Sequence, residues 1–136
     1  MKGEDLQLYD WVFFSGRSRY PMQVFGITEL DCMLNFPGNE EGDYFDGNFG
    51  EDGVGPICLT DEMLRLNGFE RHEGDEYDTW TYEDTYGEFT LFGDMFNFWV
   101  ELPGNGRDIF IYHVHQLQHL LRLVGLIELA KNFKVK

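Results

Sequence analysis

The hydrophobic and polar positions of this chain alternate with a period of two along most of its length. Apolar and aromatic runs separated by Gly, Asn, Ser and Pro predict short β-strands. The predicted strands cover residues 6–14, 20–27, 29–36, 77–83, 88–92, 95–101 and 109–112. The first three predict a small, strongly bent antiparallel β-unit of the SH3-like kind, and the later ones predict a second antiparallel sheet.

A short helix is predicted over residues 60–68. The hydroxyl of Thr60 can accept a hydrogen bond from an amide of the first turn, and Asp61 and Glu62 lie where the helix dipole favours negative charge. Gly68 suits the left-handed geometry that ends a helix. Since about two turns of helix are marginal in water, we expect this helix to pack on a sheet.

The hydrophobic period changes from two to about 3.6 near the C-terminus, which predicts a closing helix over residues 114–124. Its apolar stripe consists of Val114, Leu117, Leu120, Leu121 and Val124. We expect Leu117, Leu121 and Val124 to be buried against the second sheet. The polar residues Gln118 and Arg122 should be exposed.

Together these elements predict a single α+β domain. Its parts are an N-terminal β-unit over residues 1–59, the short helix over 60–68, and a second sheet with the closing helix over 77–136. The weak alternation of apolar residues after Leu126 fits one more short strand.

The composition narrows the class of protein. The chain has 136 residues, of which 43% are hydrophobic and 17% aromatic, so it can bury a core and is not intrinsically disordered. Its formal charge of −15 disfavours direct binding to nucleic acid or to an anionic membrane surface. No apolar run approaches the roughly 18 residues that cross a bilayer, and the N-terminus lacks a signal-peptide layout. We expect a cytoplasmic protein without a cofactor.

The negative charge is concentrated between Glu29 and Asp108, where twenty-one acidic residues stand against three Arg. One interpretation is a solvated surface that maintains solubility; the other is a surface for a partner with a basic face. The candidate partner-binding residues are Glu40, Glu41, Asp43, Tyr44, Phe45 and Trp99. Trp99 belongs to an aromatic strand that alternation divides into two faces. If both faces are covered, the strand is core, and if one is open, it is a binding patch.

Three histidines near the closing helix are candidate metal ligands: His113, His115 and His119. The spacing i, i+4 puts His115 and His119 on one helix face, and His113 could approach from the strand end. The other interpretation places His115 and His119 on the polar, solvated face of the helix. A nucleophile is harder to find. Because Cys58 lies between Ile57 and Leu59, we expect its thiol to be buried and inert.

Two motifs carry a resemblance to a known family. They are PICLTDEML at residues 56–64, followed by LNGFE at 66–70, and IYHVHQLQHL at 111–120. The chain resembles a family of small uncharacterised proteins that are common in Bacteroidetes prophages and mobile elements. It departs from the family pattern in its expanded acidic region before Val54 and in having His113. The resemblance implies an α+β architecture and a mobile-element context, and it implies no activity.

The leading hypothesis for function is therefore a non-enzymatic accessory or interaction protein of phage or mobile-element type. Two alternatives belong to other classes. One is an acidic inhibitor that occupies the nucleic-acid site of a host DNA-binding protein. The other is a metal-dependent enzyme that uses His113, His115 and His119.

Overall fold

The computed structural model describes residues 1, 3–14, 20–28, 31–35, 45–48, 53–85, 87–94, 97–101 and 108–136. The described elements are two antiparallel sheets and short helices, which confirms the predicted α+β class. The chain divides into two compact units, the first formed by residues 1–58 and 113–135 and the second by residues 59–112 with Lys136. The second unit is thus inserted between two parts of the first.

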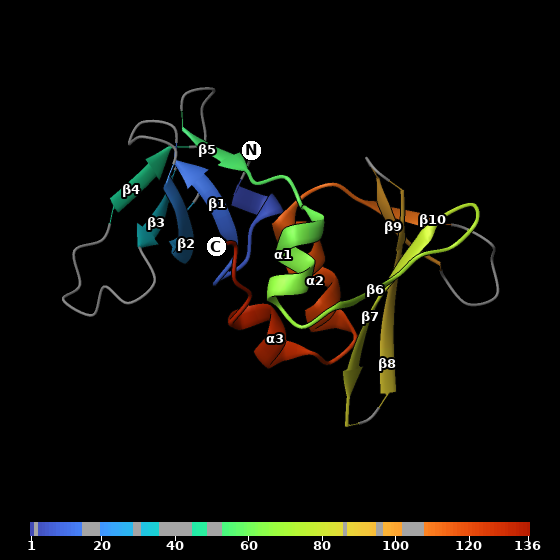
Figure 1. The fold of residues 1–136 in the computed structure, drawn as a ribbon. Helices are drawn as coiled ribbons and strands as arrows, with labels where there is room; N and C mark the ends of the chain where they lie inside the picture. Colours follow the sequence, from blue (N-terminus) through green and yellow to red (C-terminus); the bar gives the residue numbers. More distant parts are fainter. Residues whose placement is uncertain are drawn as a thin grey trace. The chain divides into compact units, whose positions relative to one another are not determined.

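The sheet of the first unit is an antiparallel meander of four strands, and a fifth strand pairs with the free side of the first (Figure 1). Its strands are β1 (Trp11–Phe14), β2 (Tyr20–Ile27), β3 (Asp31–Asn35), β4 (Phe45–Asn48) and β5 (Val54–Pro56). Their order is β4-β3-β2-β1-β5, and a register shift between Val24 and Gly26 bends the β2–β3 pair. The bent N-terminal β-unit is therefore confirmed. Its core consists of Leu6, Val12, Met22, Val24, Cys32, Leu34 and Val54.

The predicted first strand is shorter than the alternation of residues 6–14 indicated. Residues Gly3–Asp5 form a 3₁₀ turn, η1, and the strand begins only at Trp11. Between them, Tyr9 has a φ of 70°, which an L-residue seldom adopts and which interrupts an extended run.

The closing helix α2 (Val114–Leu123) is present, but it belongs to the first unit and packs on β1. The sequence prediction grouped this helix with the second sheet, whereas the structure assigns it to the first unit. Leu117 and Leu121 are buried as expected. Val124 is 53% exposed and Gln118 is fully buried, so both of these predictions are wrong. The helix ends at Leu123, and Gly125, whose φ is 90°, follows two residues later. The chain after it forms α3 (Ile127–Lys131) instead of a strand.

The described residues of the second unit form one helix and a five-stranded sheet. Its elements are α1 (Asp61–Leu66), β6 (Glu70–His72), β7 (Asp78–Asp84), β8 (Gly87–Gly93), β9 (Phe98–Glu101) and β10 (Asp108–Ile111). The sheet is an antiparallel meander in the order β10-β9-β8-β7-β6. The predicted cap of α1 is confirmed, because the Thr60 hydroxyl accepts from the Met63 amide at 3.2 Å.

One face of this second sheet is core. Alternation along the strands buries a set of large apolar side chains on it: Trp80, Leu91, Phe98, Val100 and Ile111. The Trp80 and Phe98 rings meet edge to face with their centroids 5.1 Å apart. Gly93 lies under this contact, since a Cβ there would be 2.7 Å from the Trp80 ring and 2.9 Å from the Asn97 carbonyl oxygen.

The Gly93→Ala substitution should therefore lower the free energy of unfolding by about 1–3 kcal/mol, because the added methyl group forces Trp80 and the backbone to move. Gly55→Ala is the matched control, since a Cβ at Gly55 meets no atom within 4 Å. Urea unfolding monitored by circular dichroism measures both variants. Equal stability of the two variants would contradict the packing described for Gly93.

Candidate interaction surface

Most of the predicted partner-binding residues lie outside the part of the chain that the structure describes. These are Glu40, Glu41, Asp43 and Tyr44. Phe45 is the first residue of β4, and the structure describes its backbone but not its side chain. Trp99 lies on β9 and can be placed.

The face of the second sheet that carries Trp99 is open. The strand register brings one residue of each of the five strands side by side on this face: Phe110, Trp99, Phe92, Thr79 and His72. Residues paired across antiparallel strands point to the same face. None of the five is buried, in contrast to the core residues of the opposite face. Of the two alternatives that the sequence left for β9, these exposures fit the one with a covered and an open face.

Aromatic rings cover one end of this open face. The aromatic row, as we call it, consists of Tyr77, Phe92, Trp99, Phe110 and Tyr112. Trp99 lies among the others, with ring centroids 5.9 Å from Tyr77, 6.4 Å from Phe92 and 6.1 Å from Phe110. The Phe110 and Tyr112 rings stack with their planes 12° apart. Tyr77, Phe110 and Tyr112 are between 40% and 51% exposed.

Carboxylates occupy the remaining end and margins of the same face. The pairs Asp108–Glu101 and Glu83–Glu88 lie on it, and Glu70 joins it through its pairing with Thr81. All five carboxylate residues are exposed. Glu101 and Asp108 are two positions along the strands from Trp99 and Phe110, which is about 7 Å. No Lys or Arg occupies this face among the described positions of the sheet. We call this surface, with the aromatic row, the acidic aromatic face.

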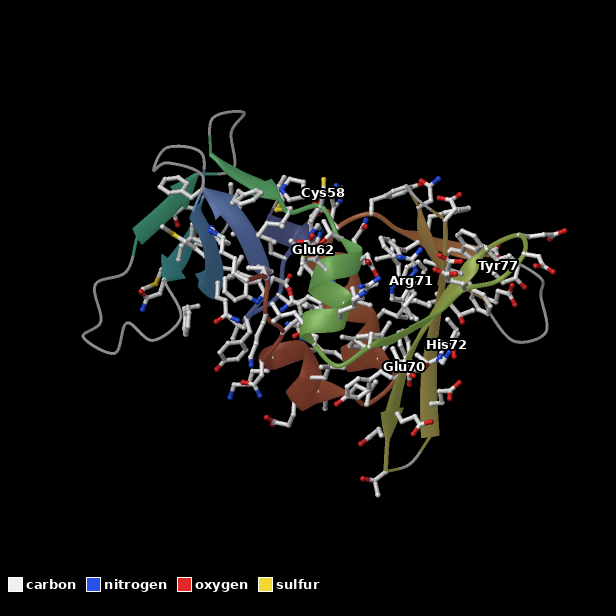
Figure 2. The ribbon with its side chains drawn as sticks, in the orientation of Figure 1. Cys58, Glu62, Glu70, Arg71, His72 and Tyr77 are labelled. Atoms are coloured by element: carbon white, nitrogen blue, oxygen red, sulfur yellow. The ribbon has the colours of Figure 1, made fainter. Side chains whose placement is uncertain are left out.

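The described arginine of the sheet points the other way. Arg71 of β6 pairs with Trp80, a residue of the core face, and its guanidinium lies 5.4 Å from the centre of that ring. Its Nε donates to Asp78 Oδ2 at 3.1 Å, and this hydrogen bond lowers the pKa of Asp78. Figure 2 labels the three residues of β6, and Arg71 lies apart from Glu70 and His72. Arg71 therefore neutralises no carboxylate of the acidic aromatic face.

The histidine region belongs to the first unit and is organised by a buried carboxylate, Asp10, which the sequence analysis did not single out. Asp10 is fully buried. Its Oδ1 accepts from Arg122 Nη1 at 2.8 Å, and its Oδ2 lies 2.5 Å from His119 Nε2 and accepts from the Gln7 amide. The interpretation of His119 and Arg122 as a solvated face is therefore wrong, because both hold this buried carboxylate.

Gln118 is buried because the backbone of the N-terminal segment needs its amide group. Its Oε1 accepts from the Trp11 amide at 3.0 Å, and its Nε2 donates to the carbonyls of Tyr9 and Ala130, each at 2.9 Å. An apolar side chain at this position would leave these groups without partners. A hydrophobicity pattern contains no signal for such a role.

The three predicted metal ligands are close together and line a cavity of about 550 Å³, together with Glu4 and Asp5. The centroid of the His115 ring lies 5.7 Å from that of the His113 ring and 5.6 Å from that of the His119 ring. In the described residues no group of three or more His, Cys, Asp or Glu is arranged to hold a metal ion.

The two cysteines differ in exposure. Burial raises the pKa of Cys32 to about 11, with a smaller contribution from the charge of Asp31. Cys58 is exposed, so the prediction of a buried thiol is wrong. Its flanking residues Ile57 and Leu59 are both buried, as alternation along an extended segment requires.

Comparison of the chain with protein-family models, with curated proteins and with solved structures gives no match. None of the helices in the described part of the chain is long and apolar enough to cross a membrane.

Replacing Asp10 by Ala should lower the free energy of unfolding by about 3–5 kcal/mol, because the guanidinium of Arg122 then loses its buried carboxylate. Arg65→Ala removes an ion pair of similar length, the 2.9 Å contact with Asp61, but Arg65 is exposed. That control should change stability by less than about 0.5 kcal/mol. Chemical denaturation measures the unfolding free energy of both variants. A loss for Asp10→Ala as small as that for Arg65→Ala would contradict the stabilising role of Asp10.

His115 should make the first unit less stable in acid. It is 7% exposed, and burial lowers its pKa to about 4 from an ordinary value of 6.5. The unfolded chain therefore binds a proton more readily than the folded chain. This contribution to stability is complete above pH 6.5 and is lost as the pH falls toward 4, by roughly 3 kcal/mol.

The His115→Asn variant isolates this effect, since Asn does not titrate. Unfolding free energies at about pH 7 and about pH 4.5 should differ more for the native chain than for the variant. The same pH dependence in both proteins would mean that His115 is not the group that titrates.

Proposed function

We propose that this protein is a non-enzymatic interaction protein that binds a basic protein partner through the acidic aromatic face. The observation that supports it is the composition of this face: aromatic rings and five carboxylates, with no Lys or Arg among its described positions. A mobile-element context, in which the protein acts as an accessory factor, rests on the resemblance of the two sequence motifs alone.

The chemistry of the face favours cationic side chains. An Arg or Lys side chain that reaches Trp99 or Phe110 can place its charge over a ring and its donors near Glu101 or Asp108. Aromatic residues also supply most of the binding energy at many protein interfaces, because they bury a large area with few rotatable bonds. The two kinds of residue thus recognise two parts of one long basic side chain.

The charge of the whole unit adds long-range attraction. Residues 59–112 contain thirteen Asp and Glu and three Arg, a formal charge of −10. Such a field raises the association rate of a basic partner and is screened over about 8 Å at physiological salt. The carboxylates should therefore influence the association rate, and the aromatic rings should influence the dissociation rate.

Trp99→Ala should reduce capture of basic partners from host lysate by at least about tenfold, because it removes the ring that contacts three others. The double variant Glu101→Gln, Asp108→Asn should reduce capture mainly at low salt. Leu123→Ala is the control, since Leu123 is an apolar side chain of α2 that is 84% exposed and lies in the other unit.

Quantitative mass spectrometry of the captured proteins measures these effects, and thermal unfolding confirms that each variant is folded. If Trp99→Ala and the double variant both capture the basic partners as well as the native protein and the Leu123→Ala control do, the proposed function is contradicted. Recovery mainly of proteins with acidic surfaces would contradict it as well.

A further inference from the structure

The sheet of the second unit ends in two edge strands of opposite character. At one edge β6 has the sequence Glu70-Arg71-His72, and all three residues are exposed. At the other edge β10 has the sequence Asp108-Ile109-Phe110-Ile111, of which Ile109 is 43% and Phe110 is 47% exposed. In the described part of the chain β10 pairs with β9 alone.

Exposed edges normally carry features that prevent another chain from pairing with them. Charged residues occupy β6, and in the first unit the edge strand β5 has three residues and ends in Pro56. From Ile109 to Ile111 there is no charge, no Pro and no Gly, and β-branched and aromatic residues favour strand pairing. β10 is thus suited to accept a strand.

We propose that β10 is the binding site of an extended, basic segment of the partner, which adds to the sheet as a further strand. This inference rests on the proposed function and names the form in which the partner binds. Four residues of β10 offer an edge of about 14 Å, so the added strand needs only a few residues.

The open face defines which side chains the added strand should carry. Its residues alternate between the two faces, so every second side chain lies on the acidic aromatic face beside Phe110 and Asp108. Lys or Arg at these alternate positions reaches a ring and a carboxylate. A second copy of this chain is a poor occupant, because β10 itself offers no Lys or Arg and each copy has a formal charge of −15.

The test uses a synthetic eight-residue peptide of alternating Lys and Val and two N-methylated forms of it. One form carries methyl groups on every Lys amide, and the other carries them on every Val amide. In a paired strand only alternate amides face the neighbouring strand. We expect one methylated form to lose at least about tenfold in affinity, and the other to bind like the parent peptide.

Amide hydrogen exchange locates the peptide on the sheet. Saturating parent peptide should slow exchange at Ile109, Phe110 and Ile111 and leave Glu70, Arg71 and His72 of the opposite edge unchanged. Sedimentation of the free protein as a dimer with protected β10 amides would overturn the proposal in favour of a second copy.

The remaining outcomes separate this inference from the proposed function. If the parent peptide binds in a manner that Trp99→Ala weakens, but both methylated forms bind equally well, strand addition is wrong and the acidic aromatic face remains the binding surface. If the parent peptide does not bind at about 1 mM, strand addition by a basic segment is wrong, and the lysate experiment still decides the proposed function.

Discussion

The first unit depends on the satisfaction of one irregular stretch of backbone. Between η1 and β1 the chain turns through the positive φ of Tyr9, so these residues cannot pair as a regular strand. Asp10 is nevertheless fully buried and Tyr9 is half-buried, so their polar groups need partners, since an unpaired buried group costs about 1–3 kcal/mol. Val24 of β2 supplies some of the partners, since it bonds the Tyr9 amide and the Asp10 carbonyl. Helix α2 supplies others: Gln118 bonds the backbone of Tyr9 and Trp11, and Arg122 donates to the Leu8 carbonyl as well as to Asp10. The polar residues on the buried side of this helix thus join the two ends of the chain, together with the hydrogen bond from Trp11 Nε1 to the Phe133 carbonyl.

This arrangement explains which parts of the fold the sequence predicted. Alternation and turn residues located most strands, and the capping chemistry of Thr60 located α1, because these signals are local. The partner of α2 was not predictable from period alone, since its apolar stripe would fit either sheet. The burial of Gln118 and the exposure of Val124 were missed for a related reason: a side chain that bonds distant backbone is buried despite being polar. Such contacts join residues more than 100 positions apart, as Trp11 and Gln118 show.

The candidate surface shows the same division. The alternation of residues 95–100 separated Trp99 from Phe98, and the structure places them on opposite faces, one open and one in the core. The register between strands could not be predicted from the sequence alone. Only pairing brings Glu70, Glu83 and Asp108, which are far apart along the chain, to the same face as Trp99. The acidic residues in the described strands therefore have a definite arrangement, which a count of charges along the sequence does not reveal.

The second unit combines an exposed strand edge, which could pair with any extended chain, with carboxylates that restrict which chains can approach it. An exposed apolar edge strand invites pairing with any extended chain, including another copy of the same protein. In the proposed binding mode, the negative charge around β10 makes that pairing unfavourable between two acidic copies and favourable with a basic chain. It does so without interrupting the hydrogen-bonding edge, as a Pro or a bulge would. Both effects require the acidic residues to lie on the same face as the aromatic rings. The register of the second sheet puts them there.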